Sequence, residues 1–161
     1  MSLENQKLAE CLGVKAVMAP VDLNTAAVTG ARISLKEGYK VAVVFNLGSS
    51  TGATVEFTLK QHTAASGGTS ANLSVDNVYY KKVGAATKFT KVEPSSAAAV
   101  YDLSSDFGGA AGQVVFEVDG SQFSEGYTHF SVDIADSAAA KIGSGLYFLS
   151  VKNEPAYSID L

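Results

Sequence analysis

The stretch YKVAVVFNLGSSTGATVEFTLKQ, residues 39–61, decides the fold class. Its first part, residues 39–47, is an almost wholly apolar run, which is typical of a strand buried on both faces. Its last part, residues 54–61, alternates strictly between apolar and polar side chains, as a half-buried strand does. About five small residues separate the two parts, a length that suits a hairpin. The stretch therefore predicts two strands and no intervening helix.

The same two-residue period continues to the end of the chain. It predicts further strands at residues 31–35, 78–83, 88–94, 98–104, 112–120, 127–135, 144–152 and 156–161. Roughly nine or ten short strands, spaced by turn residues and without long helices between them, indicate an antiparallel sandwich. The tripeptide EGY opens a strand at residues 37–39 and again at 125–127. We therefore expect an all-β, jelly-roll-like antiparallel β-sandwich with two Greek keys.

The N-terminal region has a different pattern. Residues 2–12 predict a short helix, with Ser2 as its cap and Gly13 after its last turn. The apolar stripe of this helix is Leu8, Cys11 and Leu12. An extended arm is expected to follow as far as Pro20. The expected organisation is thus a helix and arm over residues 1–20 and a β-sandwich domain over residues 21–161.

Composition excludes several classes of protein. The chain has 161 residues, 47% of them hydrophobic, which is enough to bury a core. Its net charge of −4 argues against binding nucleic acid or an anionic membrane. One cysteine permits no intrachain disulfide, and no apolar run is long enough to span a bilayer. The first residues do not resemble a secretion signal, so we expect synthesis in a reducing cytoplasm.

The loop at residues 48–52 contains G-x-S-x-G, with Ser50 at the position of a catalytic serine. A nucleophile elbow needs a helix after this turn, whereas the following residues have the period of a strand. A triad would also need a histidine, and only His62 and His129 are available. We interpret the motif as a turn and expect no enzymatic activity and no cofactor.

Other motifs also favour structural interpretations. Asp102, Ser104 and Asp106 have the spacing of a calcium loop, but the glycine and glutamate that an EF-hand requires are missing. Turn formation is therefore the expected role of these residues. The glycine-rich residues 64–70 lack the lysine of a phosphate-binding loop. Four tyrosines could form a sugar-binding platform if they were exposed together, namely Tyr79, Tyr80, Tyr127 and Tyr147.

The framework strands resemble those of small virion structural proteins of tailed bacteriophages, described as capsid decoration, cement or minor head proteins. The resemblance rests on "N-x-A-x-V-x-G-x-R-I", "Y-K-V-A-V-V-F-N-L-G", "V-E-F-T-L-K-Q-H", "F-T-K-V-E-P", "G-Y-T-H-F-S-V-D" and a closing "P-A-Y". It covers residues from about Leu23 to Leu161 and contains no catalytic motif. It implies a β-sandwich that is present in many copies in a virion and binds the major capsid protein. The protein would be made in the cytoplasm of a bacterial host and would be oligomeric in the assembled virion.

The expected contact with a neighbouring subunit lies outside the alternating framework. The residues proposed for it are Leu8, Cys11, Leu12, Val14, Val17 and Met18. The same segment could instead cover an open end of its own sandwich. Two other functions are retained as alternatives: a carbohydrate- or host-binding module of a phage tail, and a hydrolase that uses Ser50.

Overall fold

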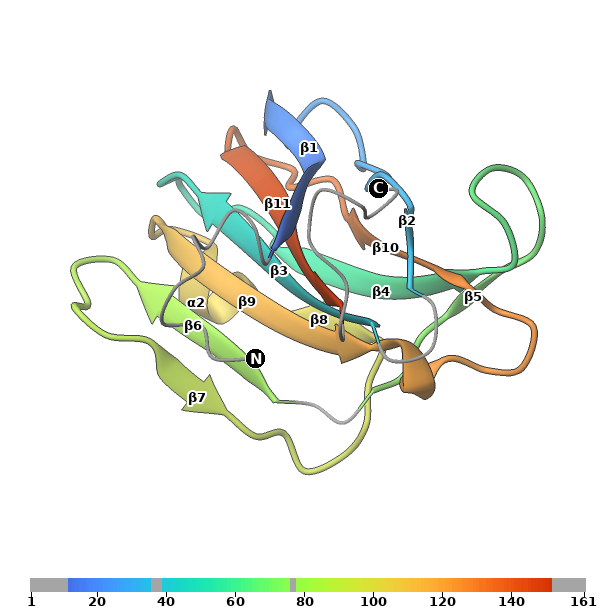
Figure 1. Cartoon of the computed structure of the whole chain (residues 1–161). Helices are drawn as coiled ribbons and strands as arrows, with labels where there is room; N and C mark the ends of the chain where they lie inside the picture. The colour runs from blue at the N-terminus through green and yellow to red at the C-terminus, as the bar shows by residue number, and fades with distance from the viewer. Residues whose placement is uncertain (1–11, 36–38, 76–77, 152–161) are drawn as a thin grey trace.

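The computed structural model describes residues 12–35, 39–75 and 78–151 and consists almost entirely of antiparallel strands (Figure 1). One sheet has six strands. In spatial order they are β1 (Gly13–Asp22), β11 (Ile142–Val151), β3 (Tyr39–Leu47), β9 (Gly112–Asp119), β6 (Tyr79–Val83) and β7 (Thr90–Val92). The other sheet has five strands. These are β2 (Ile33–Ser34), β10 (His129–Ile134), β4 (Glu56–His62), β5 (Ser70–Asn72) and β8 (Val100–Asp102), the last two both pairing with β4.

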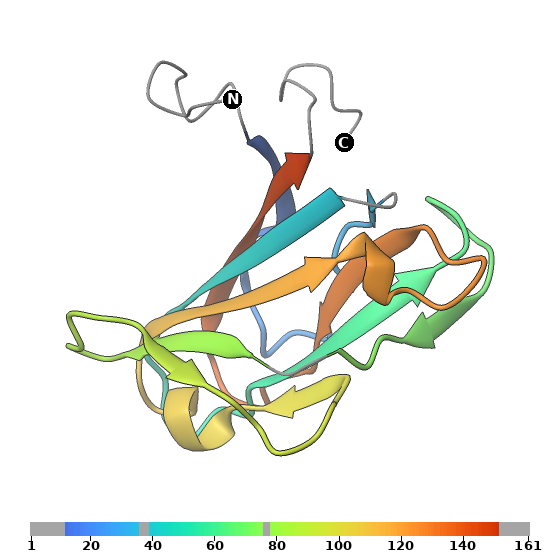
Figure 2. The ribbon, with the colours of Figure 1, turned by 60° about the horizontal axis from the view of Figure 1, so that its bottom comes forward.

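The order of the strands is that of a jelly roll. Without β5, β6 and β7, the first sheet reads β1-β11-β3-β9 and the second reads β2-β10-β4-β8. The chain crosses between the sheets at almost every step, so sequence neighbours lie in opposite layers, which Figure 2 shows edge on. The expected all-β sandwich with two Greek keys is confirmed. The hairpin β6–β7 widens the first sheet at the free side of β9.

The core lies between the two layers. Each long strand alternates, and its inward side chains are buried, as at Val43 and Phe45 in β3 and at Phe57 and Leu59 in β4. The Phe45 and Phe57 rings, from opposite sheets, have centroids 4.7 Å apart. Gly145 faces the Phe45 ring, and a Cβ atom there would come within 2.6 Å of it. A glycine is therefore required for β11 to approach β3 at this position.

Two short helical turns connect strands. The helix α2 (Ser104–Phe107) buries Phe107 beneath the loops at one end of the sandwich. The turn η2 (Gly120–Gln122) follows β9 directly, and a capping box joins Asp119 to Gln122 at its start. Both elements are too short to be recognised from periodicity.

The structure differs from the sequence prediction in three places. Residues 48–55 connect β3 to β4 in the opposite sheet, so they form no hairpin. The expected arm is the strand β1, which spans Gly13–Asp22 and therefore crosses the expected domain boundary at residue 20. The strand β5 lies in a stretch expected to be a loop. The expected helix at 2–12 and strand at 156–161 lie outside the described residues, except Leu12.

Of the two faces of the apolar strand β3, the described residues cover only one. Its inward residues are buried, whereas Ala42 and Val44 on the other face are only half-buried. The continuous apolar run was therefore a signal of an apolar outer surface as well as of a core strand.

Candidate interaction surface

The outer face of the six-stranded sheet carries apolar side chains in register across neighbouring strands. Strand pairing places Ala16 beside Leu146, Leu146 beside Val44, and Val44 beside Val115. One step along the strands, Val14 lies beside Phe148. We call Val14, Ala16, Val44, Val115 and Leu146 the apolar stripe.

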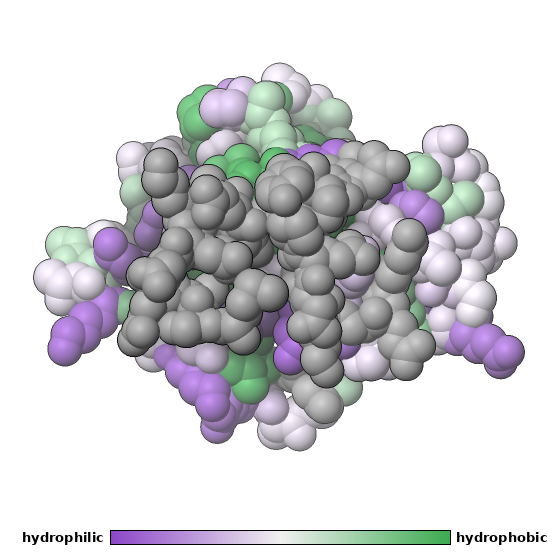
Figure 3. Space-filling view, in the orientation of Figure 1, coloured by the Kyte–Doolittle hydropathy of each residue, from purple (hydrophilic) through white to green (hydrophobic). Residues whose placement is uncertain are grey.

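The apolar stripe is partly open to solvent. Val14 is 52% exposed and Leu146 is 38% exposed, while Val44 and Val115 are half-buried by their neighbours. Figure 3 shows hydrophobic residues gathered over the part of this face where Figure 1 places β1. Contiguous exposed apolar side chains on a folded protein usually mark a binding surface.

Polar rows border the apolar stripe on both sides. On one side, the Gln113 amide donates to Oδ1 of Asn46 over 2.7 Å. On the other side, Nζ of Lys40 lies 3.6 Å from a carboxylate oxygen of Asp119. An apolar centre with a polar rim is the usual arrangement of a protein interface.

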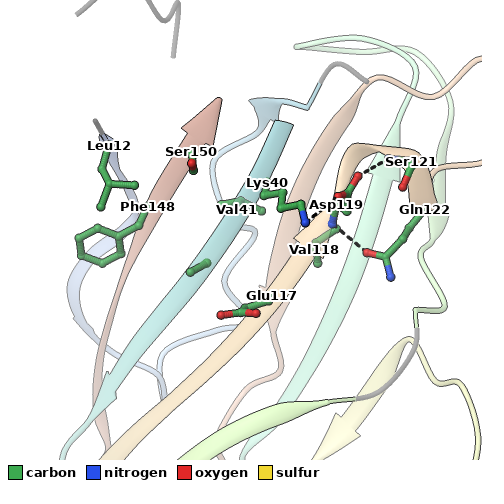
Figure 4. Close-up of a pocket in the computed structure, with 11 residues that line it drawn as sticks. Leu12, Lys40, Val41, Glu117, Val118, Asp119, Ser121, Gln122, Phe148 and Ser150 are labelled. Carbon is green, nitrogen blue, oxygen red and sulfur yellow. Dashed lines mark hydrogen bonds and ion pairs between the residues drawn. The ribbon is translucent and has the colours of Figure 1, made fainter. Parts of the chain in front are cut away.

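A groove of about 510 Å³ opens at the Lys40–Asp119 end of this face (Figure 4). Leu12 and Phe148 lie together at one end of it, and the η2 turn lies at the other. Glu117 of β9 lies between these ends, and Ala42 of β3, which pairs with Glu117, also lines the groove. Among the residues that the structure describes, the lining is Leu12, Lys40, Val41, Ala42, Glu117, Val118, Asp119, Ser121, Gln122, Phe148 and Ser150.

The residues expected at an interface fall into different places. Val14 belongs to the apolar stripe, and Leu12 lines the groove. Val17 is only 3% exposed and belongs to the core, and Met18 packs against the core. Val17 is therefore not an accessible contact residue, whereas Met18 is half-buried. Leu8 and Cys11 lie outside the described residues.

Sequence reasoning missed the larger part of this surface. The signal was present at outward positions where an apolar residue breaks the alternation, as in VAVVF at 41–45, QVVFE at 113–117 and LYFLS at 146–150. Alternation within one strand does not show which strands are its neighbours, so these residues can be assigned to one surface only with the register of the sheet.

Ser50 is part of a structural cluster around a buried lysine. Its Oγ donates to the Gly108 carbonyl over 2.5 Å and lies 3.4 Å from Nζ of Lys141. Lys141 is 1% exposed, and its ammonium donates to the carbonyls of Gly48 and Phe107, both at 2.6 Å, and over a longer distance to Ala110. Burial lowers the pKa of Lys141. The cluster ties three loops together at one end of the sandwich.

Both histidines make their contacts far from this loop in the other sheet. His62 is 2% exposed, and its Nδ1 lies 2.7 Å from Oγ of Ser70 while its Nε2 lies 2.8 Å from Oγ of Ser131. His129 contacts Thr128 through Nδ1. Each ring thus has its own partners, so the described geometry gives no support to a triad built on Ser50.

The His62 ring belongs to a chain of hydrogen bonds between strands. Arg32 donates to Oγ of Ser70, and the same Oγ is hydrogen-bonded to Nδ1 of His62. Nε2 of His62 is hydrogen-bonded to Oγ of Ser131. Burial, followed by the nearby Arg32 guanidinium, lowers the pKa of His62. His62 and its two serine partners, Ser70 and Ser131, lie between strands and are not among the described residues that line the groove.

The remaining motifs have structural partners. Oδ1 of Asp102 accepts from the backbone and the hydroxyl of Ser104, and Asp106 pairs with Lys81 at 2.6 Å. These contacts explain the calcium-like spacing as turn chemistry. Within the described parts of the chain, no group of three acidic, histidine or cysteine side chains could hold a metal ion. None of the described helices has the length and hydropathy to cross a membrane.

The tyrosines expected to form a sugar-binding platform do not lie together on the surface. Tyr79 is 6% exposed and Tyr147 is fully buried, where its hydroxyl donates to the Ala31 carbonyl. Burial raises the pKa of Tyr147 far above its ordinary value. Tyr80 and Tyr127 are only half-buried, but they come from distant elements.

Comparison with known proteins adds little to this description. No family model matches the chain, and no curated protein matches it. One similar solved structure is that of infectious bursal disease virus Gt strain, with 8% identity and a TM-score of 0.29 over 93% of this chain and 44% of that chain. Another is that of the Gx strain, with 12% identity and a TM-score of 0.23 over 91% and 38%. This chain spans less than half of either, and similarities of this size carry no functional argument.

Proposed function

We propose that the protein is a non-enzymatic structural component of a bacteriophage virion and binds the capsid surface as a decoration or cement protein. The observation that carries the proposal is the apolar stripe with its polar borders on the outer face of the six-stranded sheet. The resemblance of the framework strands to phage virion proteins names the partner class, the major capsid protein.

A protein of this kind needs a complementary surface and no reactive group. If it binds only the assembled shell, binding shifts the equilibrium toward that shell by mass action. Contacts that are modest at each site become strong when one molecule bridges several subunits. A stripe on a rigid sheet suits this role, because little conformational entropy is lost on docking.

The test is binding to expanded phage shells that lack the protein. We expect saturable, stoichiometric binding in a sedimentation assay. The double variant Val44→Asp/Leu146→Asp places two charges in the stripe and is expected to weaken binding by about 100-fold, since two central contacts of roughly 1–2 kcal/mol each are lost.

The matched control is Ser144→Asp, which adds a charge on the same face of β11, two residues from Leu146 and outside the stripe. It is expected to bind like the unmodified protein. Absence of binding to any virion component would refute the proposal. Equal binding by the double variant and the control would show that the apolar stripe is not the surface that binds the shell.

A further inference from the structure

We propose that the groove at the end of the outer face is the seat of this chain's own N-terminal segment, residues 1–11. The inference does not depend on the proposed capsid function. It starts from the position at which the described structure begins: Leu12, the first described residue, is itself part of the groove lining. The preceding residues are thus attached at the edge of the groove, where their effective concentration is high.

The dimensions of the groove fit a segment of this length. From Leu12 before β1, the lining passes over Phe148 of β11 and Ala42 of β3 to Glu117 of β9. Three strand spacings amount to about 14 Å. The segment from Ser2 to Leu12, which the sequence predicts as a helix, would be about 16 Å long at 1.5 Å per residue. It would therefore reach from the first strand to the η2 turn.

The chemistry of the groove also fits. Its floor is apolar at Phe148 and Ala42, and its far end carries Glu117, Asp119 and Gln122. On the predicted helix, Asn5, Leu8 and Leu12 share one face, because they are three and seven residues apart. Leucine side chains would then contact the apolar floor, and Asn5 would lie at the polar end. The C-terminal residues 152–161 also follow a strand that borders the groove, but they contain Pro155 and thus lack an uninterrupted helical face.

Disulfide trapping in the full-length chain tests the inference. Cys11 is replaced by Ser, so that all thiols are introduced ones. The trapping variant carries Asn5→Cys and Glu117→Cys, and Glu117 is exposed at the groove. The matched control carries Asn5→Cys and Lys82→Cys, which lies on the same sheet but on the far side of Gln113. A third variant carries Ile159→Cys and Glu117→Cys.

Under mild oxidation, the trapping variant is expected to form an intramolecular disulfide about tenfold faster than the control, because a docked segment has a higher local concentration at its site than a free one. Adding Ala42→Arg, which fills the floor with a charged side chain, is expected to abolish this difference. Equal rates in trapping variant and control would overturn the inference. Disulfides found only between two chains, or faster trapping of residue 159, would overturn it by assigning the groove to another occupant.

Discussion

At the scale of single residues, the buried Lys141 connects separate parts of the chain at one end of the sandwich. Its ammonium donates to the carbonyls of Gly48, Phe107 and Ala110, which all lie outside the strands. Removing the donor leaves buried acceptors unsatisfied, and each such group costs about 1–3 kcal/mol.

Lys141→Met is therefore expected to lower the free energy of unfolding by about 3 kcal/mol or more, since the carbonyls lose their partner while the volume is kept. Urea denaturation measures this. Lys88→Met, at an exposed turn, is the control and is expected to stay within about 0.5 kcal/mol. A loss below about 1 kcal/mol for Lys141→Met would mean that water replaces the ammonium.

His62 predicts a dependence of stability on pH. The folded protein lowers the pKa of His62 below its ordinary value of 6.5, so the unfolded chain binds a proton more readily. The contribution of His62 to the free energy of unfolding is fully present above pH 6.5, the ordinary pKa of the unfolded chain. It is lost as the pH falls through the lower pKa of the folded protein. His129 shifts in the same direction, through burial and then Arg32.

The measurement is the free energy of unfolding at pH 8 and at pH 5. We expect the unmodified protein to lose stability over this range and His62→Gln to lose less, because glutamine does not titrate. His129→Gln serves as the comparison, with a smaller change expected since its ring is less buried. The carboxylates of Asp102 and Asp119 have lowered pKa values and act in a more acidic window. Parallel pH curves for the protein and His62→Gln would contradict the prediction.

At the scale of secondary-structure elements, β3 and β11 have two faces with different roles. Val43 points into the core and is fully buried, whereas Leu146, which pairs beside Val44 on the opposite face, is partly exposed. Val43→Asp is expected to prevent folding, because an unpaired charge would be buried. Leu146→Asp is expected to change stability by no more than about 0.5–1 kcal/mol. Far-UV circular dichroism and urea midpoints distinguish them, and similar losses in both variants would show that the outer face is covered.

The elements also show how far the sequence could predict the fold. Alternation located β4, β9, β10 and β11 closely, because one face of each packs on a core. The sequence predicts an extended arm where the structure has the strand β1, because Pro20 and the mixed apolar pattern of this segment hide the alternation. The strand β5 has only three residues and exists because β4 offers it a pairing edge. The periodicity of a segment's own sequence does not show whether another strand offers it an edge to pair with.

The clusters were beyond sequence reasoning for a related reason. His62 and Ser131 are 69 residues apart, and Lys141 lies 93 residues from Gly48. They meet because strands from both halves of the chain alternate between layers. The strand that follows Ser50 is enough to predict a structural role for this serine. Its neighbour Lys141 cannot be predicted without the register of the sheets.

At the scale of the whole molecule, the first and the last described strands are neighbours. Gly13 of β1 pairs with Leu149 of β11, so the described chain begins and ends on the same side of the sheet. Domains whose ends lie close together generally tolerate circular permutation. The exposed turn between β6 and β7, at residues 84–89, is a suitable place for new ends, because exposed loop tips tolerate cleavage and insertion.

A permutant that joins residue 161 to residue 1 and opens the chain between Ala85 and Ala86 is therefore expected to fold cooperatively. Its urea midpoint should lie within about 1 M of the natural chain, since the opened hairpin contributes only the edge strand β7. Opening the chain at Gly145 instead cuts β11, which joins β1 to β3, and is expected to abolish the cooperative transition. If both permutants unfold alike, the pairing of β1 with β11 does not close the jelly roll. If only the first folds, the first and last described strands, β1 and β11, belong to one continuous sheet whose pairing the fold requires.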